Sequence, residues 1–212
     1  MIKKQWMVGF VVICMAGVVS AQGVSMLEFG GGYLNPKDTK AGTIWGGSYG
    51  FSIDERVNIS VGISYFHKNY SKTSKVADST YASNYKTNTI QKELEYNTTL
   101  LPISANANVR IPIQPPLYWY LGGSITYQFL FNTEKNYEEN VSEKRTYSGL
   151  GWMLRAGIEL AIGSRSSLFV EGFYNIGKVK RNVEETVKGL PIWEEVDVSG
   201  LGCRAGLRLE FF

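Results

Sequence analysis

The sequence predicts an all-β protein, an eight-stranded antiparallel up-and-down transmembrane β-barrel. Three observations predict this fold. Apolar and polar residues alternate in eight segments of about ten residues, charged residues avoid one face of every segment, and short connections alternate with long ones. A period of two indicates strands, because helices repeat every 3.6 residues. About ten residues is also the length that a tilted strand needs to cross a bilayer.

Composition excludes several classes of protein. The 212 residues are 44% hydrophobic and 19% charged, which argues against disorder and suits one domain. The 5 Trp, 13 Tyr, 10 Phe and 23 Gly favour many short strands over helices. One His and two Cys argue against a His-rich metal site, a zinc module or a disulfide framework. A net charge of +3 is too small to indicate nucleic acid binding, and no cofactor is expected.

The first 21 residues are expected to be a cleaved signal peptide, which leaves residues 22–212 as the barrel domain. Lys3 and Lys4 form a basic start, an apolar run follows, and the small residues Ser20 and Ala21 precede Gln22. This is the three-part pattern of a secretory signal. The apolar run is shorter than the roughly 20 residues that a membrane helix needs. The segment therefore predicts Sec-type export to the cell envelope.

Each predicted strand has one apolar face. In the last segment, Arg204, Arg208 and Glu210 share one parity, whereas Leu207 and Leu209 lie on the other. A helix would not place every charge on one parity. The eight predicted strands are 25–34, 43–53, 57–68, 101–111, 117–131, 151–162, 167–177 and 201–211. Because the number of strands is even, both ends of the barrel are expected on the same side of the membrane.

The connections between the predicted strands alternate in length. Tight turns are expected at 54–56, 112–116 and 163–166, which contain the usual turn-forming residues. The other side has residues 36–42 and three long polar loops, which are 69–92, 132–148 and 179–200. Short turns on one side and long loops on the other are typical of outer-membrane barrels. Alternation continues through the last loop, which suggests a projecting hairpin that turns near Gly189.

The charged residues of the predicted strands all lie opposite the apolar faces. A charge facing lipid near mid-bilayer costs about 2–4 kcal/mol for Arg or Lys, so the apolar faces should meet lipid. A soluble sandwich would instead turn the charged face to water. An eight-stranded barrel is just wide enough for its own side chains, so we expect a plugged lumen. The expected lumen network is Glu28, Arg110, Arg155, Glu159, Glu171, Arg204, Arg208 and Glu210, packed with Phe66, Tyr118, Tyr120, Phe169 and Phe173. A functional ion path through these charges is the alternative interpretation.

Aromatic residues gather near the ends of the predicted strands. Such residues belong at the headgroup level of a membrane. The core of a soluble β-protein would explain the aromatic composition but not this placement. The expected membrane-interface aromatics are Tyr65, Trp119, Phe129, Phe131, Trp152, Phe211 and Phe212.

Together these features resemble the eight-stranded outer-membrane barrels of the OmpA-type and opacity-protein superfamily. The signal segment, the glycine-rich stretch 29–33, residues 101–104 with 117–127, and a last strand ending in Phe carry the resemblance. It implies a Gram-negative outer membrane, with its lipid and lipopolysaccharide as partners. It also implies insertion by the barrel-assembly machinery, which reads a terminal aromatic residue. The alternation here places Phe211, and not Phe212, on the lipid face.

The resemblance implies a structural or surface-interaction role, with an extracellular ligand or host surface bound through the three long loops. A narrow channel or a transporter of small hydrophobic solutes is one alternative. Another is an outer-leaflet lipid-modifying enzyme, such as a lipid A deacylase or acyltransferase, because some eight-stranded barrels use a His and a Ser. His67 is the only His, Ser64 has the opposite parity and Ser71 lies in a loop, so we expect no catalytic residue.

The acidic residues of the loops are interspersed with Lys and Arg. Solvated loop surface is therefore a better interpretation than a cation site, and no metal site is expected. These residues are Glu134, Glu138, Glu139, Glu143, Glu184, Glu185, Glu194, Glu195 and Asp197.

Overall fold

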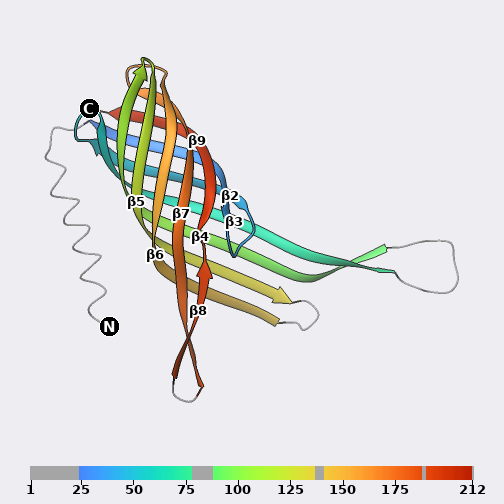
Figure 1. Cartoon of the computed structure of the whole chain (residues 1–212). Helices are drawn as coiled ribbons and strands as arrows, with labels where there is room; N and C mark the ends of the chain where they lie inside the picture. The colour runs from blue at the N-terminus through green and yellow to red at the C-terminus, as the bar shows by residue number, and fades with distance from the viewer. Residues whose placement is uncertain (1–23, 78–87, 137–140, 188–189, 212) are drawn as a thin grey trace.

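The computed structural model describes residues 24–77, 88–136, 141–187 and 190–211. Within these ranges the chain forms nine strands, shown in Figure 1. They are β1 (Ser25–Pro36), β2 (Gly42–Ser52), β3 (Val57–Ala77), β4 (Asn88–Gln114), β5 (Leu117–Asn136), β6 (Val141–Ala161), β7 (Ser166–Val187), β8 (Leu190–Asp197) and β9 (Gly200–Phe211). None of the described residues belongs to a helix with the length and apolar character needed to cross a membrane.

Eight of these strands close the barrel wall, so the predicted fold class is confirmed. Each consecutive pair from β1 to β7 is antiparallel, and β9 pairs with both β1 and β7. The ninth strand, β8, pairs only with the far part of β7. Closure leaves no sheet edge within the wall, which matters because unpaired backbone groups are costly in lipid. The even strand number places Ser25 directly beside Phe211.

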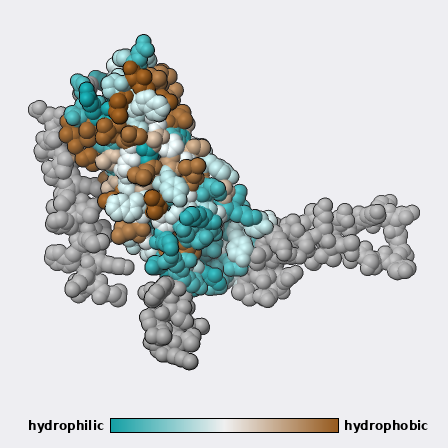
Figure 2. Space-filling view, in the orientation of Figure 1, coloured by the Kyte–Doolittle hydropathy of each residue, from teal (hydrophilic) through white to brown (hydrophobic). Residues whose placement is uncertain are grey.

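Side chains alternate between the outside of the wall and the lumen, as predicted. On β6, Trp152 and Leu154 are 61% and 60% exposed, whereas Arg155 and Glu159 are buried. Figure 2 shows hydrophobic residues over the barrel wall and hydrophilic residues where the hairpins leave it. In a bilayer the exposed apolar wall contacts lipid, so the core of this protein is its lumen.

The prediction of long loops at 69–92, 132–148 and 179–200 is wrong, because most of the described residues in these ranges belong to paired strands. β3 and β4, β5 and β6, and β7 and β8 continue past the wall as hairpins (Figure 1). Alternation is lost where both faces of a strand meet water, so the first two extensions lacked the pattern that identifies strands. The hairpin suggested in the last segment is confirmed, with Val187 opposite Leu190.

The turn predicted at 112–116 is also too long. β4 continues to Gln114, and only Pro115 and Pro116, joined by a cis peptide bond, separate it from β5. The register shifts between Pro112 and Gln114, where the proline cannot donate a ladder hydrogen bond. The tight turn after β2 agrees with prediction. Its Asp54 carboxylate accepts backbone N–H bonds two and three residues on, at 2.7 and 2.6 Å.

Candidate functional site: the barrel lumen

Inward-facing residues divide the lumen into layers along the barrel axis. The layer nearest the chain ends at residues 24 and 211 is ionic, and the layer nearest the hairpins is apolar. Neutral amides lie between them. Alternation positions all of these side chains, because every second residue of each wall strand must point inward.

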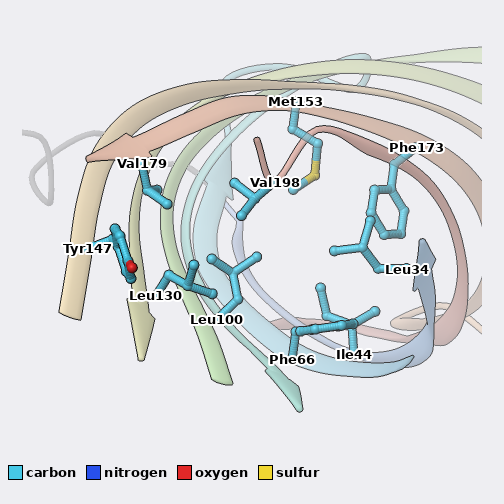
Figure 3. Packing of buried hydrophobic residues seen from close by; sticks show 10 residues of the cluster. All are labelled: Leu34, Ile44, Phe66, Leu100, Leu130, Tyr147, Met153, Phe173, Val179 and Val198. Carbon is cyan, nitrogen blue, oxygen red and sulfur yellow. The ribbon is translucent and has the colours of Figure 1, made fainter. Parts of the chain in front are cut away.

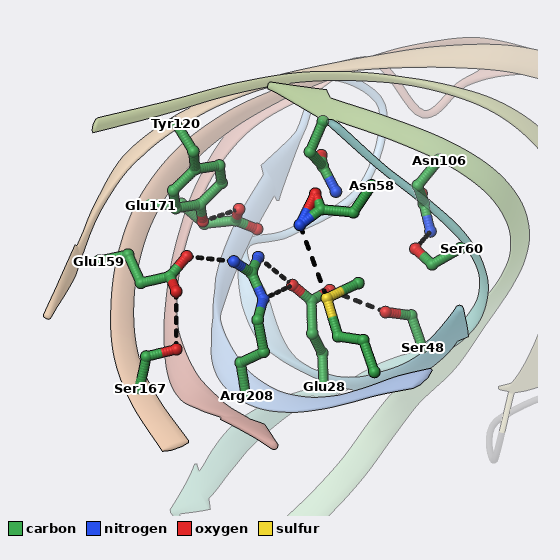
Figure 4. Close-up of polar contacts among 12 residues, drawn as sticks. Glu28, Ser48, Asn58, Ser60, Asn106, Tyr120, Glu159, Ser167, Glu171 and Arg208 are labelled. Carbon is green, nitrogen blue, oxygen red and sulfur yellow. Dashed lines mark hydrogen bonds and ion pairs between the residues drawn. The ribbon is translucent and has the colours of Figure 1, made fainter. Parts of the chain in front are cut away.

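Arg208 on β9 lies between two carboxylates (Figure 4). Its Nε donates to Glu28 at 3.0 Å, its Nη2 donates to the same carboxylate, and its Nη1 donates to Glu159. Glu28 also accepts from the Ser48 hydroxyl, and Glu159 from the Ser167 hydroxyl, each at 2.7 Å. Arg208 and Glu159 are each 1% exposed, so their hydrogen bonds and ion pairs must compensate for removing both charges from water.

Arg110 on β4 joins side chains from well-separated strands. Its Nη2 lies 2.5 Å from Glu159 Oε1 and 3.0 Å from Glu210 Oε1. β4 and β9 are separated by β1, β2 and β3 on one side of the wall, so the contact with Glu210 crosses the lumen. The guanidinium also lies over the Tyr118 ring, 5.5 Å from its centre.

A second carboxylate centre lies on β7. Glu171 accepts hydrogen bonds from Arg204 and from the Tyr120 hydroxyl. Arg155 differs from the other three lumen arginines. Its Nη2 donates to Asn108 Oδ1 at 2.7 Å, and no carboxylate of the described residues lies within ion-pair distance. The structure thus places all eight charged residues named from the sequence in the lumen, and seven of them form ion pairs with one another.

Neutral amides occupy the layer above the charges. Gln128 Nε2 donates to Thr126 Oγ1 and to Asn175 Oδ1, both at 2.8 Å. Asn175 Nδ2 donates in turn to the Val198 carbonyl at 2.8 Å. Gln128 and Asn175 are almost fully buried, and their mutual bonds satisfy polar groups that would otherwise be costly.

Toward the hairpins the lumen is lined by what we call the apolar collar, which sequence reasoning missed. Each wall strand, or the segment just before it in the case of β9, contributes one residue (Figure 3). These are Leu34, Ile44, Phe66, Leu100, Leu130, Tyr147, Val179 and Val198, none more than 4% exposed. Ile44, Phe66 and Leu100 are cross-strand neighbours, and the same row continues through Leu130 to Tyr147.

A sequence signal for the apolar collar did exist. At the hairpin ends of the strands, an apolar residue appears on the otherwise polar parity, as Leu100 does before Leu101 and Leu130 does between Phe129 and Phe131. Such apolar pairs and triplets look like the end of an alternating strand. In the structure they mark the level at which both faces of the wall are apolar.

The predicted interface aromatics that the structure describes lie on the outer wall. Tyr65, Trp119, Phe131, Trp152 and Phe211 are between 43% and 61% exposed. Phe129 is partly exposed, and its ring packs edge to face on Tyr127, with centres 4.9 Å apart. Phe212 lies outside the described residues.

His67 faces outward at the hairpin end of the wall. Its Nδ1 lies 3.2 Å from Thr99 Oγ1, and its ring stacks on Tyr65 with centres 6.0 Å apart. The hydroxyl beside His67 is therefore that of Thr99. Ser64 borders the lumen, and Ser71, expected in a loop, lies on the extension of β3.

Among the acidic loop residues named from the sequence, those with described side chains have basic or hydroxyl partners. Glu143 pairs with Arg145 at 2.6 Å, and Glu195 pairs with Lys178 and Lys180 at 2.8 and 2.9 Å. No group of three His, Cys, Asp or Glu side chains in the described part of the chain is placed to hold a metal. The side chains of Glu138, Glu139, Glu184 and Glu185 lie outside that part.

Comparison with solved structures shows the same fold in several bacterial proteins. The outer membrane protein OprG from Pseudomonas aeruginosa has a TM-score of 0.59 at 12% identity, over 89% of this chain and 96% of that one. A major outer membrane protein from Thermus thermophilus has a TM-score of 0.55 at 14% identity, over 90% and 100%. Ail, the attachment invasion locus protein of Yersinia pestis, has a TM-score of 0.53 at 11% identity, over 89% and 99%.

At these identities the structural likeness shows the fold alone. A search of curated proteins returned no match. The family described as outer membrane protein beta-barrel domain, however, matches residues 10–208, which is nearly the whole chain. The closed eight-stranded wall, its apolar exterior and this match together show that the chain belongs to the outer membrane β-barrel family, as its OmpA-type and opacity-protein resemblance implied.

Proposed function

We propose that this protein is a closed barrel that acts through its surface hairpins rather than through a pore. The observation that carries the proposal is that all eight wall strands direct side chains into the lumen, where ion pairs and apolar packing join them. A cavity bordered by Glu28, Arg155 and Arg204 has a volume of about 20 Å³, which is room for roughly one water molecule.

Two barriers of different kinds lie in series along the lumen. An ion would have to displace buried ion pairs, and breaking such a pair by losing one partner costs about 3–5 kcal/mol. It would then meet the apolar collar, and apolar constrictions exclude water. This arrangement supports a closed barrel over the ion path and the narrow channel.

Planar-bilayer recording tests the closed lumen. The wild-type protein should give no steady conductance steps. The control is a variant with Ser at Phe66, Leu100, Leu130, Arg110 and Glu159, which should conduct if it shows the heat-modifiable gel shift of a folded barrel. Steady steps from the wild-type protein would contradict the proposal.

The hairpins supply surface for interactions outside the membrane. The last residue of β3 paired with β2 is His67, and β3 then continues from Lys68 to Ala77 paired only with β4. Ten residues of strand at about 3.3 Å each span roughly 33 Å. β7 and β8 form a second extension from Lys178 onward. This reach supports a surface-interaction role.

The hairpin segments differ in charge. Residues 69–92 contain four Lys and one Asp, a net charge of +3. Residues 179–200 contain three basic and five acidic residues, a net charge of −2. The first segment therefore favours anionic ligands. Ail was crystallised in complex with the heparin analogue sucrose octasulfate, and this makes polysulfated ligands the first class to test here.

Titration calorimetry with sucrose octasulfate tests the surface role. Replacing Lys72, Lys75, Lys86 and Lys92 by Gln should abolish binding. The matched control replaces the same number of lysines in the other two segments, which are Lys135, Lys144, Lys180 and Lys188, and should retain it. Equal losses in the two variants, or no binding by the wild-type protein, would count against this ligand class.

Export and assembly complete the proposal. Residues 1–21 direct Sec-type export and are removed, so the mass of the purified protein should correspond to a chain that begins at Gln22. The barrel-assembly machinery inserts residues 22–212 among outer-membrane lipid and lipopolysaccharide, using Phe211 or Phe212. The protein has no catalytic role, so cells that produce wild-type or His67→Ala protein should have identical lipid A masses.

A further inference from the structure

We propose that a groove in the outer wall holds an acyl chain of an outer-leaflet lipid. The groove has a volume of about 610 Å³ and runs across β9, β1, β2, β3 and β4. Its floor is formed largely by glycines of β1 and β2, and its sides include the rings of Phe29, Trp45 and Tyr65.

Glycines shape this groove by letting two rings lie against the backbone. A Cβ on Gly31 would overlap the Trp45 ring, and a Cβ on Gly47 would lie 3.2 Å from the Phe29 ring. With any larger residue the rings would have to move away from the wall. Trp45 and Phe29 nevertheless remain 63% and 54% exposed, so each ring presents apolar surface to whatever fills the groove.

The position of the groove identifies its occupant. It opens on the apolar wall, and this wall is the lipid-facing surface of a barrel in this family. The groove is therefore continuous with the interface between protein and bilayer. A flexible hydrocarbon chain can follow this surface and keep contact with both rings.

A polar row lies beside the groove on the hairpin side and orients the lipid. Thr43, His67 and Thr99 are outward-facing cross-strand neighbours on β2, β3 and β4. His67 stacks on Tyr65, which borders the groove, and its Nδ1 is engaged with the Thr99 hydroxyl, so Nε2 lies on the opposite edge of the ring. The acyl chain therefore lies against the Phe29 and Trp45 rings, with its headgroup at this row.

Tryptophan fluorescence tests the site directly. In one variant Trp45 is the only tryptophan, and in its matched control Trp152 is the only one. Both side chains lie on the outer wall near the hairpin end, and they are 63% and 61% exposed. The purified variants in detergent micelles are titrated with a phospholipid that carries brominated acyl chains, which quench indole fluorescence on contact.

The proposal predicts saturable quenching of Trp45 at equimolar lipid. Trp152 should be quenched only gradually, as lipid becomes a larger fraction of the micelle. Identical curves for the two tryptophans would overturn the proposal, and the variant that retains Trp45 leaves every groove-lining residue in place.

A substitution that fills the groove provides a second test. Ala205 lines the groove and faces outward. Ala205→Phe should therefore weaken the affinity for lipid, measured by quenching of Trp45, about tenfold or more. Ala156→Phe on β6, also outward and exposed, is the matched control and should leave the affinity unchanged. Both should keep the heat-modifiable gel shift. An unchanged affinity in folded Ala205→Phe would overturn the proposal.

Discussion

The two ends of the lumen are lined by opposite kinds of chemistry. At one end, four carboxylates and four arginines are held out of water, seven of them by mutual pairing. At the other end, the apolar collar lines the lumen with buried side chains that pack together. Stability of the ionic end is concentrated in a few groups, because each unpaired charge is costly. Stability of the apolar collar is shared among many contacts. The two ends should therefore respond differently to single substitutions.

Arg208→Met is expected to have the largest effect. It leaves Glu28 buried without an ionic partner and Glu159 with Arg110 alone, which costs about 3–5 kcal/mol. Urea unfolding in lipid vesicles would measure this loss. Adding Glu28→Gln to the same variant should recover most of the stability, because Glu28 is then uncharged and Glu159 keeps its ion pair with Arg110. A single variant as stable as the wild-type protein would show that pairing does not hold this end.

Leu100→Ala tests the apolar collar and should have a smaller effect. The Leu100 side chain is 1% exposed inside the lumen, so removing it costs about 2–4 kcal/mol in the same unfolding measurement. Leu101→Ala is the matched control, because the next residue faces the outer wall, where lipid can fill the space. Equal losses in the two variants would contradict a packed apolar collar.

Arg155→Met distinguishes a paired from an unpaired buried arginine. No carboxylate of the described residues pairs with Arg155. Its removal therefore takes a hydrogen-bond donor only from the amide oxygen of Asn108. The expected change is about 1 kcal/mol or less, in either direction, since an apolar side chain avoids the cost of a buried charge. A loss as large as that of Arg208→Met would show that Arg155 is held by the carboxylates around it.

The smallest effect is expected at the exposed β7–β8 hairpin. Hydrogen bonds from Lys178 and Lys180 hold the pKa of Glu195 below its usual range. The ion pairs therefore contribute fully above the ordinary carboxyl pKa, and their contribution is lost as the pH falls through the lowered one. An NMR titration should show the pKa of Glu195 rising when Lys178 and Lys180 are replaced by Gln. A pKa that does not move would rule out these bonds as its cause.

Part of the lumen could be predicted strand by strand. A charge facing lipid is costly on any strand, so parity alone assigns residues such as Glu28, Arg155 and Glu171 to the inside. Pairing could not be predicted in this way. The contact between Arg110 and Glu210 joins strands separated by three others, and it depends on how far the strands tilt and shift when the sheet closes.

Alternation along the chain determined the fold class, the lipid-facing wall and the side of the wall on which each charge lies, because each of these depends only on neighbouring residues in one strand. Tertiary structure decided which charges meet, how far the hairpins extend and where the apolar collar forms. These features depend on contacts between distant strands. Closure of the wall sets all of those contacts together, so no single segment of the sequence carries them.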